Sequence, residues 1–128
     1  MKVNYPPAHA TSGFSYHNFY KEVIHEKNVV IAFGGGIVLN KINIDHLNQS
    51  FVVICSKTSP EIIFQRISKD GKEKRPLLNK PNPMEEIHKL LDFRAPFYNA
   101  ATEHQIDTLV LTINEIVEKI CKIYESAQ

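Results

Sequence analysis

Short, continuous runs of apolar residues constrain the fold of this chain more than any other feature. Two of them, Asn28 to Phe33 (NVVIAF) and Phe51 to Cys55 (FVVIC), are rich in β-branched residues and have the length of a strand. Apolar residues on both sides of a strand are typical of a parallel sheet that is covered on both faces. A third run, Ile106 to Leu111 (IDTLVL), has the same character. The sequence therefore predicts three buried strands.

Segments with helical spacing alternate with these runs. Three of them start at a residue that can cap a helix, namely Ser59 before Pro60, Asn82 and Thr112. The second and third caps are followed by a glutamate at the third helical position. Their apolar faces are Ile62, Ile63 and Ile67; Ile87, Leu90 and Leu91; and Ile113, Ile116, Val117, Ile120 and Ile123. Strands alternating with such helices predict an α/β fold, in which ligands bind beyond the carboxyl ends of the strands.

The length of 128 residues indicates one compact domain. Residues 1–13 contain two prolines and several small polar residues, so we interpret them as a tail or linker. Residues 14–128 are then the domain itself.

Charge and composition exclude several classes of function. The formal net charge is +1, and the lysines are spread along the chain, so we expect no nucleic-acid binding. No apolar run approaches the roughly 20 residues of a membrane span, and the start of the chain does not look like a signal peptide. Cys55 and Cys121 form no CxxC pair and the six histidines are scattered. We therefore expect free thiols, no metal site of histidines or cysteines, and a cytoplasmic location.

Two motifs follow the first two strands. Gly34, Gly35 and Gly36 come directly after NVVIAF, where bare backbone N–H groups could approach an anion or a hydroxyl group closely. A plain tight turn is the alternative. The charged segment that ends in RPLL, at residues 75–78, could be a mobile lid that carries cations across a phosphate, or simply a solvated connection.

Two further motifs lie near the third strand. Arg94-Ala95-Pro96-Phe97-Tyr98 places an arginine just before a proline that we expect to break its helix, and a surface arginine is the alternative reading. Asp107-Thr108 lies inside the third strand, where a buried polar pair satisfied by backbone groups is the simpler interpretation.

In this order and spacing, the motifs resemble the shikimate kinase family from about Tyr16 to the last helix. The family pattern is GGG after a strand, an SPE-led helix with an arginine, RPLL, RxPxY and DT before the final helix. The resemblance implies an α/β fold of the parallel-sheet, P-loop kinase-like, three-layer type, here truncated at its amino-terminal end. It also implies ATP-dependent phosphorylation of the 3-hydroxyl of shikimate, a step of aromatic amino acid biosynthesis, with ATP and Mg²⁺ as cofactors.

The resemblance assigns substrate-binding roles to named residues. Gly34, Gly35 and Gly36, together with Arg94, would hold shikimate. A family arginine that helps to hold the shikimate carboxylate aligns loosely with His17. Because histidine is mostly neutral at pH 7, we expect His17 to bind the carboxylate more weakly than an arginine would.

The remaining arginines match nucleotide positions of the family. Arg75 of RPLL would be the catalytic residue of a lid at about residues 69–82, close to the transferred phosphate and the nucleotide. Arg66 would contact adenine. The chain contains twelve lysines and only three arginines, and all three arginines match functional positions of the family. Arginine is favoured where a planar, bidentate donor to carboxylate or phosphate is needed.

Other parts of the family pattern do not occur in this sequence. There is no GxxGxGK[ST] phosphate-binding loop, no Gly-Lys-Ser or Gly-Lys-Thr, and no DxD-type segment after such a loop. The first-shell Mg²⁺ ligand and the backbone cradle for the phosphates are therefore missing from it. We expect no efficient catalysis from this chain alone.

Three hypotheses remain open from the sequence. The first is a shikimate kinase whose amino-terminal part is either lost from this sequence or supplied by another chain. The second is a non-catalytic degenerate module that binds shikimate or a protein partner, and the third is an unrelated α/β interaction domain. In the family, the first strand lies between the strands that correspond to NVVIAF and FVVIC. We therefore expect self-association, or binding of a missing amino-terminal fragment, to complete the sheet.

Overall fold

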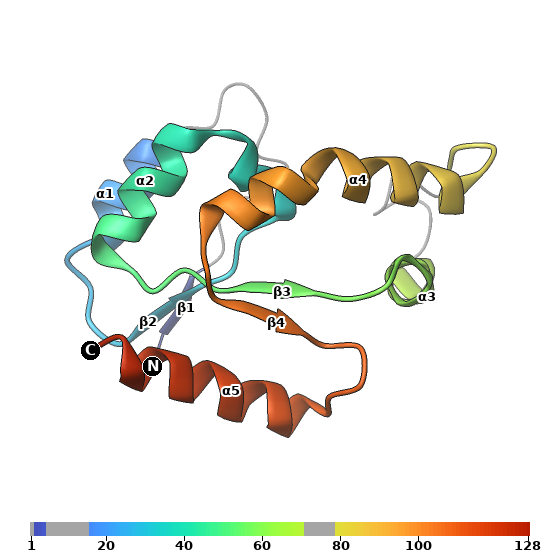
Figure 1. Ribbon diagram of the computed structural model, residues 1–128. Helices are drawn as coiled ribbons and strands as arrows, with labels where there is room; N and C mark the ends of the chain where they lie inside the picture. Colours follow the sequence, from blue (N-terminus) through green and yellow to red (C-terminus); the bar gives the residue numbers. More distant parts are fainter. Residues whose placement is uncertain (1, 5–15, 71–78) are drawn as a thin grey trace. The chain divides into compact units, whose positions relative to one another are not determined.

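The computed structural model describes residues 2–4, 16–70 and 79–128 (Figure 1). The chain divides into two compact units, Met1–Val53 and Ile54–Gln128. Both units contain a pair of parallel strands with helices, which confirms the predicted α/β class. No helix of the described ranges is both long and apolar enough to cross a membrane.

The first unit is built around a short pair of parallel strands. Its elements are β1 (Lys2–Asn4), α1 (Tyr16–Val23), β2 (Val29–Ile31), the 3-10 helix η1 (Gly35–Leu39) and α2 (Lys41–Ser50). Val3 of β1 lies opposite Val30 of β2. The core contains the buried side chains of Val23, Ile37, Ile44 and Leu47. Because Lys2–Asn4 form a strand, our interpretation of residues 1–13 as a tail or linker is wrong for these residues.

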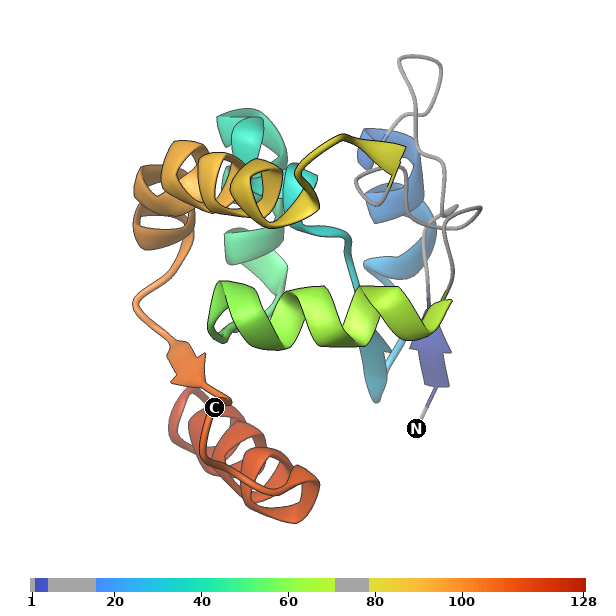
Figure 2. The ribbon, with the colours of Figure 1, turned by 90° about the vertical axis from the view of Figure 1, so that its right-hand side faces the viewer.

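The second unit contains the other strand pair and the longer helices. Its elements are β3 (Cys55–Lys57), α3 (Pro60–Asp70), α4 (Pro83–Ala101), β4 (Gln105–Asp107) and α5 (Ile113–Ser126). Ser56 of β3 lies opposite Ile106 of β4 in a parallel ladder. Figures 1 and 2 show α4 and α5 on opposite sides of this strand pair. The core of the unit contains Ile87, only 2% exposed, with Ala101 and Ile106.

The starts of α3, α4 and α5 are those that the sequence predicts. Ser59 Oγ accepts the N–H of Ile62 at 3.3 Å, and Asn82 Oδ1 accepts that of Glu85 at 3.3 Å. At the start of α5, Thr112 and Glu115 form both hydrogen bonds of a capping box. These side chains satisfy backbone N–H groups that have no partner inside the helix, which is why local sequence is sufficient to place them.

The strands are shorter and displaced relative to the prediction. Phe51 to Ile54 are half-buried but form no strand, and β3 begins at Cys55. Pairing with β4 sets these bounds, because Cys55 N–H donates to the carbonyl of His104 and Thr108 N–H donates to that of Lys57. After Asp107 the chain turns, since the carboxylate of Asp107 accepts the N–H of Leu109 at 3.0 Å.

The prediction that Pro96 breaks its helix is wrong. Helix α4 continues through Pro96 to Ala101. Proline removes one backbone N–H and crowds the carbonyl four residues earlier, which costs about 3 kcal/mol in a helix interior. The rest of this 19-residue helix retains its regular structure on both sides of Pro96, and Ile87 and Ala101 anchor it in the core. Arg94 is therefore held on a continuous helix.

Candidate functional site

The glycine triplet leads from β2 into η1. Gly34 has φ −67° and ψ 156°, a backbone conformation that any residue can adopt, and it caps η1. A Cβ placed on Gly34 would meet no atom within 4 Å. Neither the conformation of Gly34 nor the packing around it therefore requires glycine. The exposed backbone of Gly34, Gly35 and Gly36 is instead open to close approach by a ligand.

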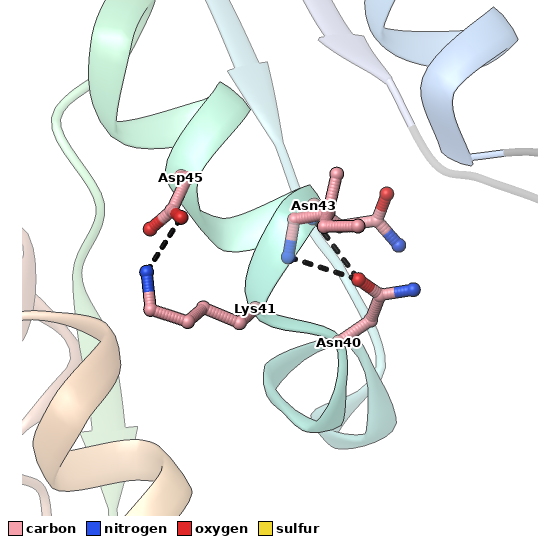
Figure 3. Close-up of polar contacts among 5 residues, drawn as sticks. Asn40, Lys41, Asn43 and Asp45 are labelled. Carbon is pink, nitrogen blue, oxygen red and sulfur yellow. Dashed lines mark hydrogen bonds and ion pairs between the residues drawn. The ribbon is translucent and has the colours of Figure 1, made fainter.

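The segment that follows the triplet is fixed at both ends. The side chain of Ile37 is buried, at 7% exposure. Asn40 then caps α2, because its side-chain oxygen accepts the N–H groups of Ile42 at 3.0 Å and Asn43 at 3.3 Å (Figure 3). Lys41 and Asp45 form an exposed ion pair at 2.7 Å on the first turn. Sequence reasoning missed α2, although Asn40 and the spacing of Ile44 and Leu47 could have indicated it.

Arg94 is a half-buried residue of α4 with an unusual environment. Its Nε atom is buried and has no hydrogen-bond partner. Among the described residues, no carboxylate forms an ion pair with Arg94. A buried donor without a partner costs about 1–3 kcal/mol, more for a charged group, so native proteins seldom keep one without a reason. The Nε group of Arg94 thus lacks the hydrogen bond that its burial calls for.

The structure describes the other predicted site residues only in part. Arg66 lies exposed on α3. His17 lies in α1, but its side chain is outside what the structure describes. Arg75 and most of the predicted lid at residues 69–82 also lie outside the described residues.

The predicted site residues are distributed over both units. His17 and Gly34 to Gly36 belong to the first unit, and Arg66 and Arg94 belong to the second. That they form one site stays a prediction.

The Asp107-Thr108 pair has a structural role. Thr108 is buried, and its N–H and its Oγ1 both donate to the carbonyl of Lys57, at 2.8 and 3.1 Å. Asp107 is exposed and caps the turn at Leu109. The interpretation as a buried polar residue satisfied by backbone groups is therefore correct for Thr108. Its hydrogen bonds connect the end of β4 to the end of β3.

Sequence reasoning overlooked Thr58. It follows β3 directly, and its Oγ1 is buried without a hydrogen-bond partner. Thr58 and Arg94 are the two described residues that carry such an atom. Nothing in the local sequence indicates this, because the lack of a partner depends on the packing of distant segments.

Possible metal-ligating side chains are dispersed over the described residues. No three carboxylate, histidine or cysteine side chains among them lie close enough together to hold a metal. The sequence contains no Gly-Lys-Ser or Gly-Lys-Thr that could cradle phosphates and bind Mg²⁺.

Burial raises the pKa of the half-buried Cys55 thiol, although nearby Lys57 opposes this, so Cys55 stays protonated at neutral pH.

Comparisons with known proteins agree with these features. A family model described as Shikimate kinase matches residues 15–125. The shikimate kinase of Thermoanaerobacter pseudethanolicus is 48% identical over 98 residues, which are 77% of this chain and 56% of that protein. That of Caldanaerobacter subterraneus is 44% identical, with the same two shares. The chain thus spans little more than half the length of the curated relatives that it matches.

Solved structures show the same likeness. A shikimate kinase from Acinetobacter baumannii, in complex with shikimate, superimposes with a TM-score of 0.71 and 28% identity, covering 88% of this chain and 62% of its own. The enzyme from Bacteroides thetaiotaomicron gives a TM-score of 0.65 and 25% identity, with shares of 86% and 64%.

Proposed function

Because the chain belongs to the shikimate kinase family, we propose that it supplies the shikimate-binding part of such an enzyme. In this proposal Gly34, Gly35, Gly36 and Arg94 bind shikimate, with His17 as a weaker contact. ATP-dependent phosphorylation of the 3-hydroxyl of shikimate then takes place once a phosphate-binding segment completes the site. Arg66 and Arg75 act toward the nucleotide.

The buried, unpartnered Nε of Arg94 is the observation that carries this proposal. Shikimate is a carboxylic acid, and a guanidinium group donates two parallel hydrogen bonds to a carboxylate. Such a ligand would satisfy the Nε group at no further desolvation cost to the protein. The open backbone at Gly34 supports the proposal, because a hydroxylated ring can contact peptide groups there without displacing a side chain.

Titration calorimetry with shikimate tests the proposal. The chain should bind shikimate, and Arg94→Ala should abolish the binding. Lys89→Ala is the matched control, because it removes an exposed cation from the same helix, where Lys89 pairs with Glu85 at 3.3 Å. Equal affinity of the wild-type chain and Arg94→Ala would remove Arg94 from the site, and a chain that binds no shikimate at millimolar concentration would contradict the proposal.

A second candidate function is a degenerate module that binds shikimate or a protein partner without turnover. It would account for the lack of a phosphate-binding motif in this sequence. The two candidates differ when a phosphate-binding segment of a relative is added. Phosphorylation of shikimate by the mixture supports the kinase, and its absence despite binding of both components supports the module.

A further inference from the structure

Arg94 lies midway between the two buried residues of α4. Ile87 is 2% and Ala101 is 5% exposed, and each of them is two helical turns, or about 10 Å along the helix axis, from Arg94. Residues two turns apart lie on the same face of a helix, so the three side chains share the face that packs on the core. Arg94 is therefore held in place by the packing of α4 on both sides of it.

Pro96 interrupts the connection between Arg94 and the second of these buried residues. Proline has no backbone N–H group, so the helical hydrogen bond from residue 96 to the carbonyl of residue 92 cannot form. A missing bond of this kind is a common cause of a bend in a helix. The helix nevertheless continues to Ala101. The orientation of the turn after Pro96 therefore depends, more than that of an ordinary helical turn, on contacts from outside the helix.

The side chain of Gln105 makes such a contact. Its Nε2 group donates to the carbonyl of Tyr98 at 3.3 Å, to that of Thr102 at 3.4 Å and to Oδ1 of Asn99 at 3.2 Å. The last four carbonyl groups of a helix have no partner inside it, so an amide that donates there acts as a carboxyl-terminal cap. Helix α4 has no basic residue in its last turn and ends in an extended conformation at Thr102. Gln105 thus supplies a cap that the end of the helix itself does not contain.

The backbone of Gln105 is fixed by the strand pair. Gln105 is the first residue of β4 and lies opposite Cys55 in the parallel ladder with β3. Cys55 N–H donates to the carbonyl of His104 at 3.0 Å, and the side chain of Ile106 is buried. Gln105 therefore connects a strand of fixed register to the turn of α4 that follows Pro96.

We propose that Gln105 is a positioning residue, which fixes the second half of α4 and thereby the orientation of Arg94 for shikimate binding. This inference rests on the proposed function, in which Arg94 binds the ligand. A guanidinium group donates two parallel hydrogen bonds to a carboxylate only when the two planes are aligned, so a small rotation of the helix would cost one of these bonds. Gln105 acts through Arg94 and does not itself contact the ligand.

Titration of the full chain with shikimate in a calorimeter tests the proposal. Gln105→Met keeps the length of the side chain but removes its donors, and it should weaken binding by a factor of about 3–10, the range that the net strength of one hydrogen bond allows. Gln105→Lys returns donors to the carbonyl groups at the helix end and should recover most of the affinity. Gln49→Met is the matched control, because it makes the same change at an exposed position of α2 and should bind as the wild type does.

Nuclear magnetic resonance of the arginine Nε–H groups separates positioning from a contribution to stability alone. The chain has three arginines, so at most three such signals occur, and Arg94→Met identifies that of Arg94 by its loss. In the Gln105→Met chain without ligand this signal should shift, because the surroundings of the buried Nε–H change when α4 reorients. A residue that contributed to stability alone would lower the melting temperature and leave the signal in place, as Gln49→Met should.

Two results would overturn the proposal. One is a folded Gln105→Met chain with wild-type affinity or with an unchanged Arg94 signal, and the other is a Gln105→Lys chain that binds no better than Gln105→Met. If Gln105→Met does not fold, Asn99→Ala takes its place under the same criteria, because it removes one exposed acceptor of the Gln105 amide. A wild-type chain that binds no shikimate contradicts the proposed function alone, since the Arg94 signal is measured without the ligand.

Discussion

At the scale of single residues, we expect Arg94 to lower the stability of the free chain and to contribute to ligand binding. Its buried Nε without a partner destabilises the folded chain unless a ligand is bound. We expect Arg94→Met to keep or raise the melting temperature, by up to about 1–2 kcal/mol in unfolding free energy, while shikimate no longer stabilises the variant. Thermal denaturation with and without shikimate measures both effects. Arg66→Met, at an exposed position, is the control, and a loss above about 1 kcal/mol in Arg94→Met would indicate a structural partner.

A substitution at Gly34 also tests stability and ligand binding separately. Because its φ is −67° and no atom lies within 4 Å of a Cβ placed there, Gly34→Ala should fold normally. Restricting the unfolded chain should stabilise the variant by about 0.4–1 kcal/mol. Shikimate affinity should nevertheless fall, because the added methyl group would occupy the space of the ligand. Unchanged affinity in a calorimetric titration would show that the ligand does not approach Gly34.

The two cysteines should react at different rates. Cys121 is exposed, whereas burial raises the pKa of the Cys55 thiol. Since the thiolate is the reactive form, iodoacetamide at about pH 8 should modify Cys121 first. A raised pKa in the folded state also means that the unfolded chain loses this proton first, so the contribution of Cys55 to stability is lost as pH rises above the ordinary thiol range. Peptide mapping by mass spectrometry follows both sites, and faster labelling of Cys55 would contradict the assignment.

At the scale of elements, α5 depends on its amino-terminal cap. Thr112 and Glu115 satisfy each other's backbone N–H groups, and no residue of α5 is buried to anchor the helix. Thr112→Ala should therefore lower the free energy of unfolding by about 1 kcal/mol. Chemical denaturation measures this loss. Asn114→Ala, an exposed position outside the capping box, should change it by less than about 0.5 kcal/mol.

Helices were more predictable than strands for a physical reason. A cap such as Asn82 or Thr112 acts on backbone groups two or three residues away, so the sequence contains the whole interaction. A strand depends on a partner distant in sequence, and for that reason the apolar run at residues 51–55 predicted the wrong bounds for β3. The expected helix break at Pro96 failed because packing of the whole of α4 outweighs one lost hydrogen bond.

The candidate site was predictable only in part. The glycine triplet and Arg94 are recognisable from motif order, and the structure adds the open backbone of Gly34 and the unpartnered Nε of Arg94. The sequence did not indicate that the buried Oγ1 of Thr58 has no hydrogen-bond partner, nor that Thr108 has a structural role. Both features depend on contacts of β3 with segments that are distant in sequence, and these contacts exist only in the folded chain.

At the scale of the whole molecule, the lack of a phosphate-binding motif in this sequence bears on the activity of the chain alone. The chain alone should not phosphorylate shikimate above background, because removing even one preorganised donor can cost a factor of about 10²–10³ in rate. A coupled assay of ADP release measures this. Turnover that survives purification and disappears in Arg75→Ala would refute the prediction, and it would require a phosphate site among other residues.

The large apolar side chains exposed on α5 and just before it also have a consequence for the protein in a cell. Chaperones and proteases act on chains that expose apolar surface, and small changes in stability can alter abundance several-fold. A polypeptide with 84% of Val110 and 79% of Ile113 exposed is a natural target of such surveillance. Its steady-state level should then respond strongly to substitutions that lower the stability of the fold.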